Sequence, residues 1–248
     1  MSIDVRVDTS ELNGLVRQLK GLNERGISFA TGRATNNVAF KIRDGWKSMA
    51  QQVFDRPTRF TINSVLVRRA TRANPHARVF IRDQAGAGIA PEVYLQQQVL
   101  GGERRLKRSE VALQALGVLP PGFRAVPGKG LRLDSSGNVP GRAMKAIIDQ
   151  LNKGGNTGDR GVFALSAPRG KLLPGVYRRR QKGKQERSVT PLLIFVRSPR
   201  YAARLEIFDF ARDVMRRESV PEFRAALTAE IERALAKAAR SAGTGATP

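Results

Sequence analysis

The chain of 248 residues contains no cysteine and a single histidine, His76. The lack of cysteine excludes disulfide bonds, thiolate metal sites and a cysteine nucleophile. A catalytic triad or a histidine metal site would have to include His76. This residue follows Pro75 in an expected turn, so we interpret it as a solvated turn residue rather than a catalytic group. The sequence therefore favours a protein that is not an enzyme.

Long apolar runs are also missing. The longest, residues 192–196, has the length of a strand, whereas a membrane helix needs about 20 apolar residues. Residues 1–6 contain Asp4 and no apolar segment of the kind that a signal peptide requires. We therefore expect no contact with a membrane and assembly in a cytoplasm.

Acidic residues are scarce, because 21 Asp and Glu stand against 44 Lys and Arg, for a formal net charge of +23. Such a charge favours an anionic partner, either nucleic acid or the acidic faces of neighbouring subunits. Asp134, Asp149, Asp159 and Glu186 lie in separate segments, so a shared metal site is not expected. The glycine-rich stretch 154–161 lacks the GK[ST] ending of a phosphate-binding loop, and no cofactor is expected.

Helical and strand patterns are present on both sides of a loop-rich middle. In the first part, the patterns predict a strand over residues 3–7, a helix over 8–22, a long helix over 27–53 that ends before Pro57, and a β-hairpin with its turn at 73–75. Residues 84–160 are rich in glycine and proline and predict short helices at 93–100, 107–116 and 142–151, with loops elsewhere.

The last part predicts an antiparallel meander and a final helix. Strands are expected at residues 162–165, 176–180 and 192–196, and a helix capped by Ser219, with Pro221 in its first turn, at 221–240. The whole is an α+β fold in which long helices pack on an antiparallel sheet. We expect an N-terminal core over 1–83, an insertion or subdomain over 84–160, a C-terminal core over 161–240 and a flexible tail over 241–248.

Basic residues are concentrated in two places, and these are the candidate contacts with a protein partner or with DNA. The hairpin supplies Arg68, Arg69, Arg72 and Arg78, and a later run supplies Arg178, Arg179, Arg180, Lys182, Lys184 and Arg187. On the hairpin, one face is expected to be apolar and the other a basic strip. Tyr177 is the only aromatic residue near the later run, so any nucleic-acid contact there is expected to be non-specific and electrostatic.

Several segments together resemble a known family of phage proteins. They are residues 34–39 (ATNNVA), residues 68–79 with the run RRAT-x-x-NP-x-AR-V, residues 198–201 (SPRY) and residues 218–223 (ESVPEF). In these segments the chain is similar to the minor tail protein Z, or tail-completion, family of lambda-like tailed phages and to the related head–tail joining proteins. Residues 90–153, with YLQQQVLGGERR and LPPG, depart from the shorter lambda-type members.

The resemblance implies a structural virion protein in the neck of the particle, where head and tail join. It implies a homo-oligomeric ring around the DNA path, with portal, adaptor or tail-tube proteins as neighbours, and leaves non-specific contact with passing DNA open. It carries over no catalytic, cofactor-binding or metal-binding residue. The alternatives are a non-specific nucleic-acid-binding protein that acts alone and, less favoured, a divergent nuclease.

Overall fold

The computed structural model describes residues 3–7, 24–86, 88–154, 161–182, 186–198 and 200–243. The chain forms two compact units, which we call unit 1 (Met1–Val99 with Ala203–Pro248) and unit 2 (Leu100–Ala202). Both contain helices and antiparallel strands, so the expected α+β class is confirmed. The helix expected at residues 8–22 lies outside the described residues.

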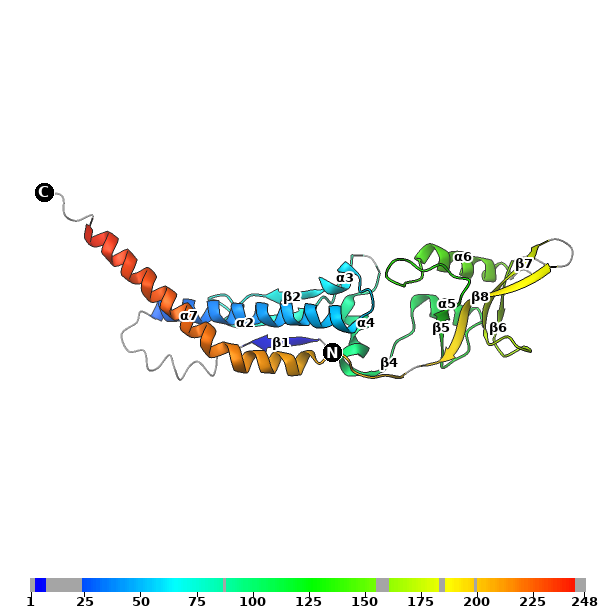
Figure 1. Cartoon of the computed structure of the whole chain (residues 1–248), viewed down its shortest axis with the longest axis horizontal. Coiled ribbons are helices and arrows are strands. Elements are labelled where there is room, and N and C mark those ends of the chain that lie inside the picture. Colours follow the sequence, from blue (N-terminus) through cyan, green and yellow to red (C-terminus); the bar gives the residue numbers. More distant parts are fainter. Residues whose placement is uncertain are drawn as a thin grey trace. The chain divides into compact units, whose positions relative to one another are not determined.

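Unit 1 is built from two long helices and a small sheet (Figure 1). The predicted hairpin is confirmed, because β2 and β3 pair in antiparallel from Val65 opposite Ile81 to Arg68 opposite Arg78. The first strand pairs with the other edge of β3, which gives the order β1–β3–β2. The elements are β1 (Asp4–Val7), α2 (Glu24–Val53), α3 (Arg59–Ile62), β2 (Val65–Arg68), β3 (Ala77–Ile81), α4 (Pro91–Leu100) and α7 (Ile207–Gly243).

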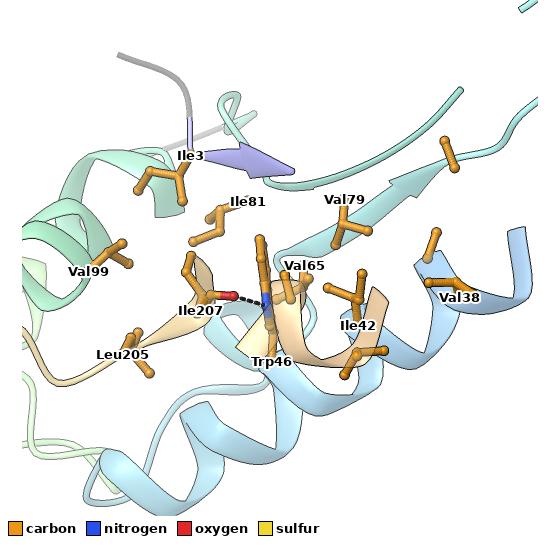
Figure 2. Close-up of a cluster of buried hydrophobic side chains, with 14 of the residues drawn as sticks. Ile3, Val38, Ile42, Trp46, Val65, Val79, Ile81, Val99, Leu205 and Ile207 are labelled. Atoms are coloured by element: carbon orange, nitrogen blue, oxygen red, sulfur yellow. Dashed lines mark hydrogen bonds between the residues drawn. The ribbon is translucent and has the colours of Figure 1, made fainter. Parts of the chain in front are cut away.

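The core of unit 1 lies between the sheet and α2. Alternate side chains of β3, including Val79 and Ile81, are buried, and α2 contributes Val38, Ile42 and Trp46 to the same cluster (Figure 2). Burying a side chain of this kind stabilises a fold by roughly 1.5–3 kcal/mol. The strand period of two and the helix period of 3.6 thus direct both apolar faces into one core.

Helices α2 and α7 run antiparallel and contact each other over most of α2. The indole Nε1 of Trp46 donates a hydrogen bond of 3.0 Å to the carbonyl oxygen of Ile207 at the start of α7. Near the other end of α2, Ala30 is buried against Phe223, and both side chains are fully excluded from solvent. Alanines on α2 allow this close approach of the two helices.

The C-terminal helix begins earlier than its sequence suggests. It starts at Ile207, so the expectation of an N-cap at Ser219 and of Pro221 in the first turn is wrong. Ser219 lies inside the helix and its Oγ donates a hydrogen bond of 2.6 Å to the Met215 carbonyl oxygen. Pro221 also lies inside, where it lacks an N–H donor, and Figure 1 shows that α7 changes direction along its length. The helix continues to residue 243, into the expected tail.

Unit 2 contains a four-stranded antiparallel sheet and two helices. The meander β6–β7–β8 is confirmed, and the sheet has the order β5–β8–β7–β6. The strand β5 lies in a segment that was expected to be loop, and that expectation is wrong, because Phe123 to Pro127 pair with β8. The elements are β4 (Gly102–Glu103), α5 (Arg108–Ala115), β5 (Phe123–Pro127), α6 (Gly141–Asn152), β6 (Gly161–Leu165), β7 (Gly175–Lys182), β8 (Glu186–Arg197) and β9 (Arg200–Tyr201).

The two helices of unit 2 pack against its sheet. Leu113 from α5, Ile147 from α6 and Val176 from β7 are buried in one cluster. The three short helices expected in the middle region are present as α4, α5 and α6. The units do not coincide with the expected division at residues 83 and 160, because strands from both sides of residue 160 form the same sheet.

Candidate partner-binding surface

Three arginines form a row across the sheet of unit 1. Arg78 on β3 lies directly opposite Arg6 on β1 and opposite Arg68 on β2. Since side chains alternate along a strand, the row lies on the face opposite to that of Val79, which contacts α2. Arg6 and Arg68 are exposed, and the Arg78 side chain is 33% exposed. The sheet therefore presents a basic strip that extends from the hairpin onto a third strand. We call these residues the arginine row.

The arginine row places like charges opposite one another on neighbouring strands of the sheet. Like charges that lie directly opposite each other destabilise a strand pair, and such cross-strand terms amount to roughly 0.2–1 kcal/mol. Asp4 forms an ion pair with Arg78, and the Arg78 guanidinium lies 5.3 Å from the centroid of the Phe80 ring. Within the described part of the chain, Arg6 and Arg68 form no ion pair. Two of the cations in the row thus lack a counter-charge from the fold.

Arg69 and Arg72 follow the row in sequence and differ in their surroundings. The Arg69 guanidinium lies 5.0 Å from the centroid of the Phe40 ring on α2, and that of Arg43 lies 4.8 Å from the same centroid. Arg43 also pairs with Asp44, with 2.7 Å between Nε and Oδ1. Arg72 is exposed in the hairpin turn. Arg69 therefore contributes to the hairpin–helix contact, while Arg72 remains available to a partner.

The second basic group lies in unit 2, on and after β7. Arg180 is exposed, while the Arg179 guanidinium lies 4.8 Å from the centroid of the Phe163 ring. Arg178 is half-buried and lines a hollow in the surface. The backbones of Lys182 and Arg187 belong to β7 and β8, their side chains are not among those described, and Lys184 lies outside the described residues.

The hollow beside β7 has a volume of about 560 Å³ and is lined by Arg132, Asp134 and Arg178 as well as the start of α6. The carboxylate of Asp134 is occupied by its own loop, because Oδ1 accepts hydrogen bonds from the N–H groups of Ser136 at 2.9 Å and Asn138 at 2.8 Å. The lining of the hollow thus carries two guanidinium groups and one carboxylate.

The acidic residues do not form a catalytic cluster in the part of the chain that the structure describes. Asp149 pairs with Lys145 at 2.6 Å, Asp159 lies outside the described residues, and nothing is described of the Glu186 side chain. No group of three or more His, Cys, Asp or Glu side chains among the described residues could hold a metal ion. His76 is exposed in the hairpin turn.

Two neighbouring asparagines on α2 connect this helix to the hairpin and to α7. Asn36 Oδ1 accepts a hydrogen bond of 2.7 Å from the N–H of Ala70, and its Nδ2 donates one of 3.1 Å to the Ala70 carbonyl oxygen. Asn37 Nδ2 donates a hydrogen bond of 2.8 Å to Glu222 Oε2 on α7. The pair of asparagines thus connects α2 to the hairpin through Asn36 and to the C-terminal helix through Asn37.

An ion-pair group strengthens the contact between α2 and α7. Lys41 Nζ lies 2.6 Å from Glu218 Oε2 and 2.7 Å from Glu222 Oε1. The hydrogen bonds with Glu218 and Glu222 raise the pKa of Lys41. Burial opposes ionisation of Glu222, but hydrogen bonds from Lys41 and Asn37 outweigh it and lower the pKa of this carboxyl group. Lys41 and Glu222 are therefore both charged at neutral pH.

Some residues of these surfaces were not among the candidates. Arg6 belongs to the arginine row, Arg132 lines the hollow, and Arg43 flanks Phe40. The alternation of Ile3 and Val5 with Arg6 indicates a polar strand face, but it does not indicate that this strand pairs with β3. For Arg6 and Arg132 the missing information was a contact between residues far apart in sequence, whereas Arg43 and Phe40 are only three residues apart on α2.

Comparison of the chain with protein-family models, with curated proteins and with solved structures finds no match. Among the described residues, no helix combines the length and the apolar character needed to cross a membrane.

Proposed function

We propose that the chain is a structural, non-catalytic subunit of the neck or tail-completion ring in a tailed-phage virion. The observation that carries the proposal is that three of the segments resembling the minor tail protein Z family meet in unit 1. Asn36 bonds to Ala70 in the hairpin, and Asn37 bonds to Glu222 in α7. The residues that carry the resemblance thus lie where α2, the hairpin and α7 of this chain contact one another.

In this role the mechanism is architectural. The α2–α7 pair and the sheet of unit 1 fix the shape of this unit through a buried core. Exposed cations such as Arg72 in unit 1 and Arg180 in unit 2 would contact acidic faces of portal, adaptor or tail-tube proteins. A closed homo-oligomeric ring would repeat each weak contact, so that avidity makes the whole attachment strong.

The proposal is tested by electron microscopy of particles assembled without this protein. We expect filled heads and complete tails that fail to join, and joined infectious particles when the wild-type chain is supplied in trans. A chain with Asn36→Ala and Asn37→Ala should restore joining less well than one with the exposed Gln51→Ala on the same helix. Normal infectious particles in the absence of the protein would overturn the proposal.

The nuclease alternative predicts a different result with the purified chain. It requires metal-dependent cleavage of plasmid DNA that is lost on Asp134→Ala. We expect no cleavage with Mg²⁺ or Mn²⁺, because no group of three or more His, Cys, Asp or Glu side chains among the described residues could hold a metal ion. Cleavage that disappears in this variant would replace the structural role by an enzymatic one.

A further inference from the structure

We infer that the outward face of the three-stranded sheet in unit 1 binds the phosphate backbone of double-stranded DNA through the arginine row. The inference goes beyond the proposed function, because it concerns the purified chain and holds whatever particle contains it. Its basis is the register that places Arg6, Arg78 and Arg68 opposite one another on adjacent strands.

The fold does not account for the whole row, because two of its three cations, Arg6 and Arg68, have no ion pair with a described residue. The core of unit 1 lies on the opposite face, where Val65, Val79 and Ile81 point toward Trp46 (Figure 2). Only one cation of the row, Arg78, has an ion pair with a described acid, Asp4. A face whose like charges repel one another is stabilised when an anionic partner covers it.

The side chains of the outward face indicate the chemistry of its partner. Protein interfaces bury a central patch that is rich in aromatic and apolar groups and poor in charge. The outward face has no large exposed apolar side chain among its described residues, since Leu66 and Phe80 are both half-buried. Charge alone therefore remains to attract a partner, and a DNA duplex offers about one negative charge per 1.7 Å of its length. This complementarity favours DNA over an acidic protein.

The described side chains of this face suit duplex rather than single-stranded DNA, and non-specific rather than sequence-specific contact. Single strands are bound by exposed aromatic rings that stack on bases. The aromatic ring on this face, that of Phe80, is half-buried with the Arg78 guanidinium above it. Arginines on the face of a strand suit contact with phosphates, and such contacts position a protein on DNA without reading its sequence.

The geometry also sets the number of contacts. Neighbouring strands lie about 4.8 Å apart, so the outer arginines of a three-strand row start roughly 10 Å from each other. Their long side chains can reach separate phosphates of one DNA strand. Each phosphate neutralised contributes about 0.9 to the slope of log K against log salt concentration. Removing Arg6 and Arg68 should therefore lower that slope by about 2.

The test uses the purified full-length chain and a short mixed-sequence DNA duplex with a fluorescent label. Binding is followed by anisotropy from about 50 to about 200 mM salt, the range over which phosphate contacts lose affinity steeply. The variant Arg6→Gln with Arg68→Gln removes the two unpaired cations of the row. The matched control, Arg142→Gln with Lys171→Gln, removes two exposed cations from unit 2. Both variants have the same net charge.

We expect the row variant to bind DNA at least tenfold more weakly at low salt, with a shallower slope, and the control to bind like the wild type. We also expect the row variant to melt no lower than the wild type, because it loses like-charge repulsion. Trp46 lies in the core beneath the sheet, and its fluorescence should be unchanged in both variants.

Several outcomes would overturn the inference. Equal weakening by both variants would show that net charge, not the row, attracts DNA. A lower melting temperature for the row variant would give the arginines a structural role. Row-dependent binding of polyglutamate or of anionic lipid vesicles, without DNA binding, would assign the face to an acidic protein or to a membrane surface.

Discussion

Glu110 is a buried charge in unit 2, and its replacement by glutamine tests how much this charge stabilises the unit. Its side chain is 1% exposed. Oε2 accepts hydrogen bonds from Arg104 Nη1 at 2.6 Å and from the N–H of Lys107 at 2.8 Å. Oε1 accepts one from Arg104 Nη2 at 2.5 Å and one from the N–H of Ala125 at 2.9 Å. One carboxylate thus joins the start of α5 to β5.

The change Glu110→Gln keeps the shape of the side chain and removes its charge. A glutamine has one carbonyl oxygen, so the donors at the other position face an NH₂ group instead of an acceptor. The Arg104 guanidinium, which is 16% exposed, loses its counter-ion. Breaking a buried ion pair by removing one partner costs about 3–5 kcal/mol. This is a large part of the roughly 5–15 kcal/mol that stabilises a typical folded protein.

Amide hydrogen exchange followed by mass spectrometry measures the loss in unit 2 directly. We expect protection of the amides in α5 and β5 to fall by a factor of 10² or more, since each 1.4 kcal/mol is about tenfold. The control is Lys145→Gln, which removes the exposed ion pair with Asp149 and should cost less than about 1 kcal/mol. If Glu110→Gln changes protection no more than this control, the reasoning about the buried carboxylate is refuted.

Three further perturbations follow from the same kind of argument. Asn36→Ala removes both hydrogen bonds to the buried Ala70 backbone and should lower the free energy of unfolding by about 1–3 kcal/mol, as measured by urea unfolding followed by Trp fluorescence. A loss no greater than that caused by replacing an exposed asparagine with alanine would contradict this prediction. Gly45→Ala should destabilise unit 1 by about 1–3 kcal/mol although alanine favours helices, because the added Cβ would lie 2.0 Å from Phe210 Cζ. A second substitution in the same chain, Phe210→Ala, should relieve this loss of stability. If the full loss persists in the double variant, the clash is not its cause. Burial alone would raise the pKa of Glu110, but the hydrogen bonds from Arg104 and from the backbone have the larger and opposite effect, so the pKa is lowered. The stability that Glu110 contributes to the fold is therefore fully present above its unfolded pKa of about 4.3 and is lost as the pH falls through the lower folded value. Unfolding of unit 2 across acid pH should show this dependence in the wild type and lack it in Glu110→Gln.

Local patterns predicted most of the individual elements. The long helix α2, the hairpin β2–β3, the three short helices and the meander were all read from periodicity and turn residues, and each is present. In each of these elements the apolar residues recur at the spacing that places them on one face of a helix or strand. The chain buries this face whatever element it packs against. Element type follows from this local rule.

The errors occurred where a partner distant in sequence decides the local structure. Residues 123–127 end in Pro127 and have weak strand character, and they are a strand because they pair with the edge of β8. The first turns of α7 precede a proline that usually marks a helix start, yet Ile207, Ala211 and Val214 are buried in the unit 1 core. Packing against α2 outweighs the local signal at Pro221.

The sequence by itself determined the excess of basic over acidic residues, the α+β class and the position of the hairpin. These depend on composition and on periodicities of a few residues, which can be read without a partner. Only the tertiary structure decided that Arg6 joins Arg78 and Arg68 in one row, and that β5 belongs to the sheet of the meander. Strand pairing brings together residues that are far apart in the chain, and its register is set by which faces are buried, so no local pattern contains it.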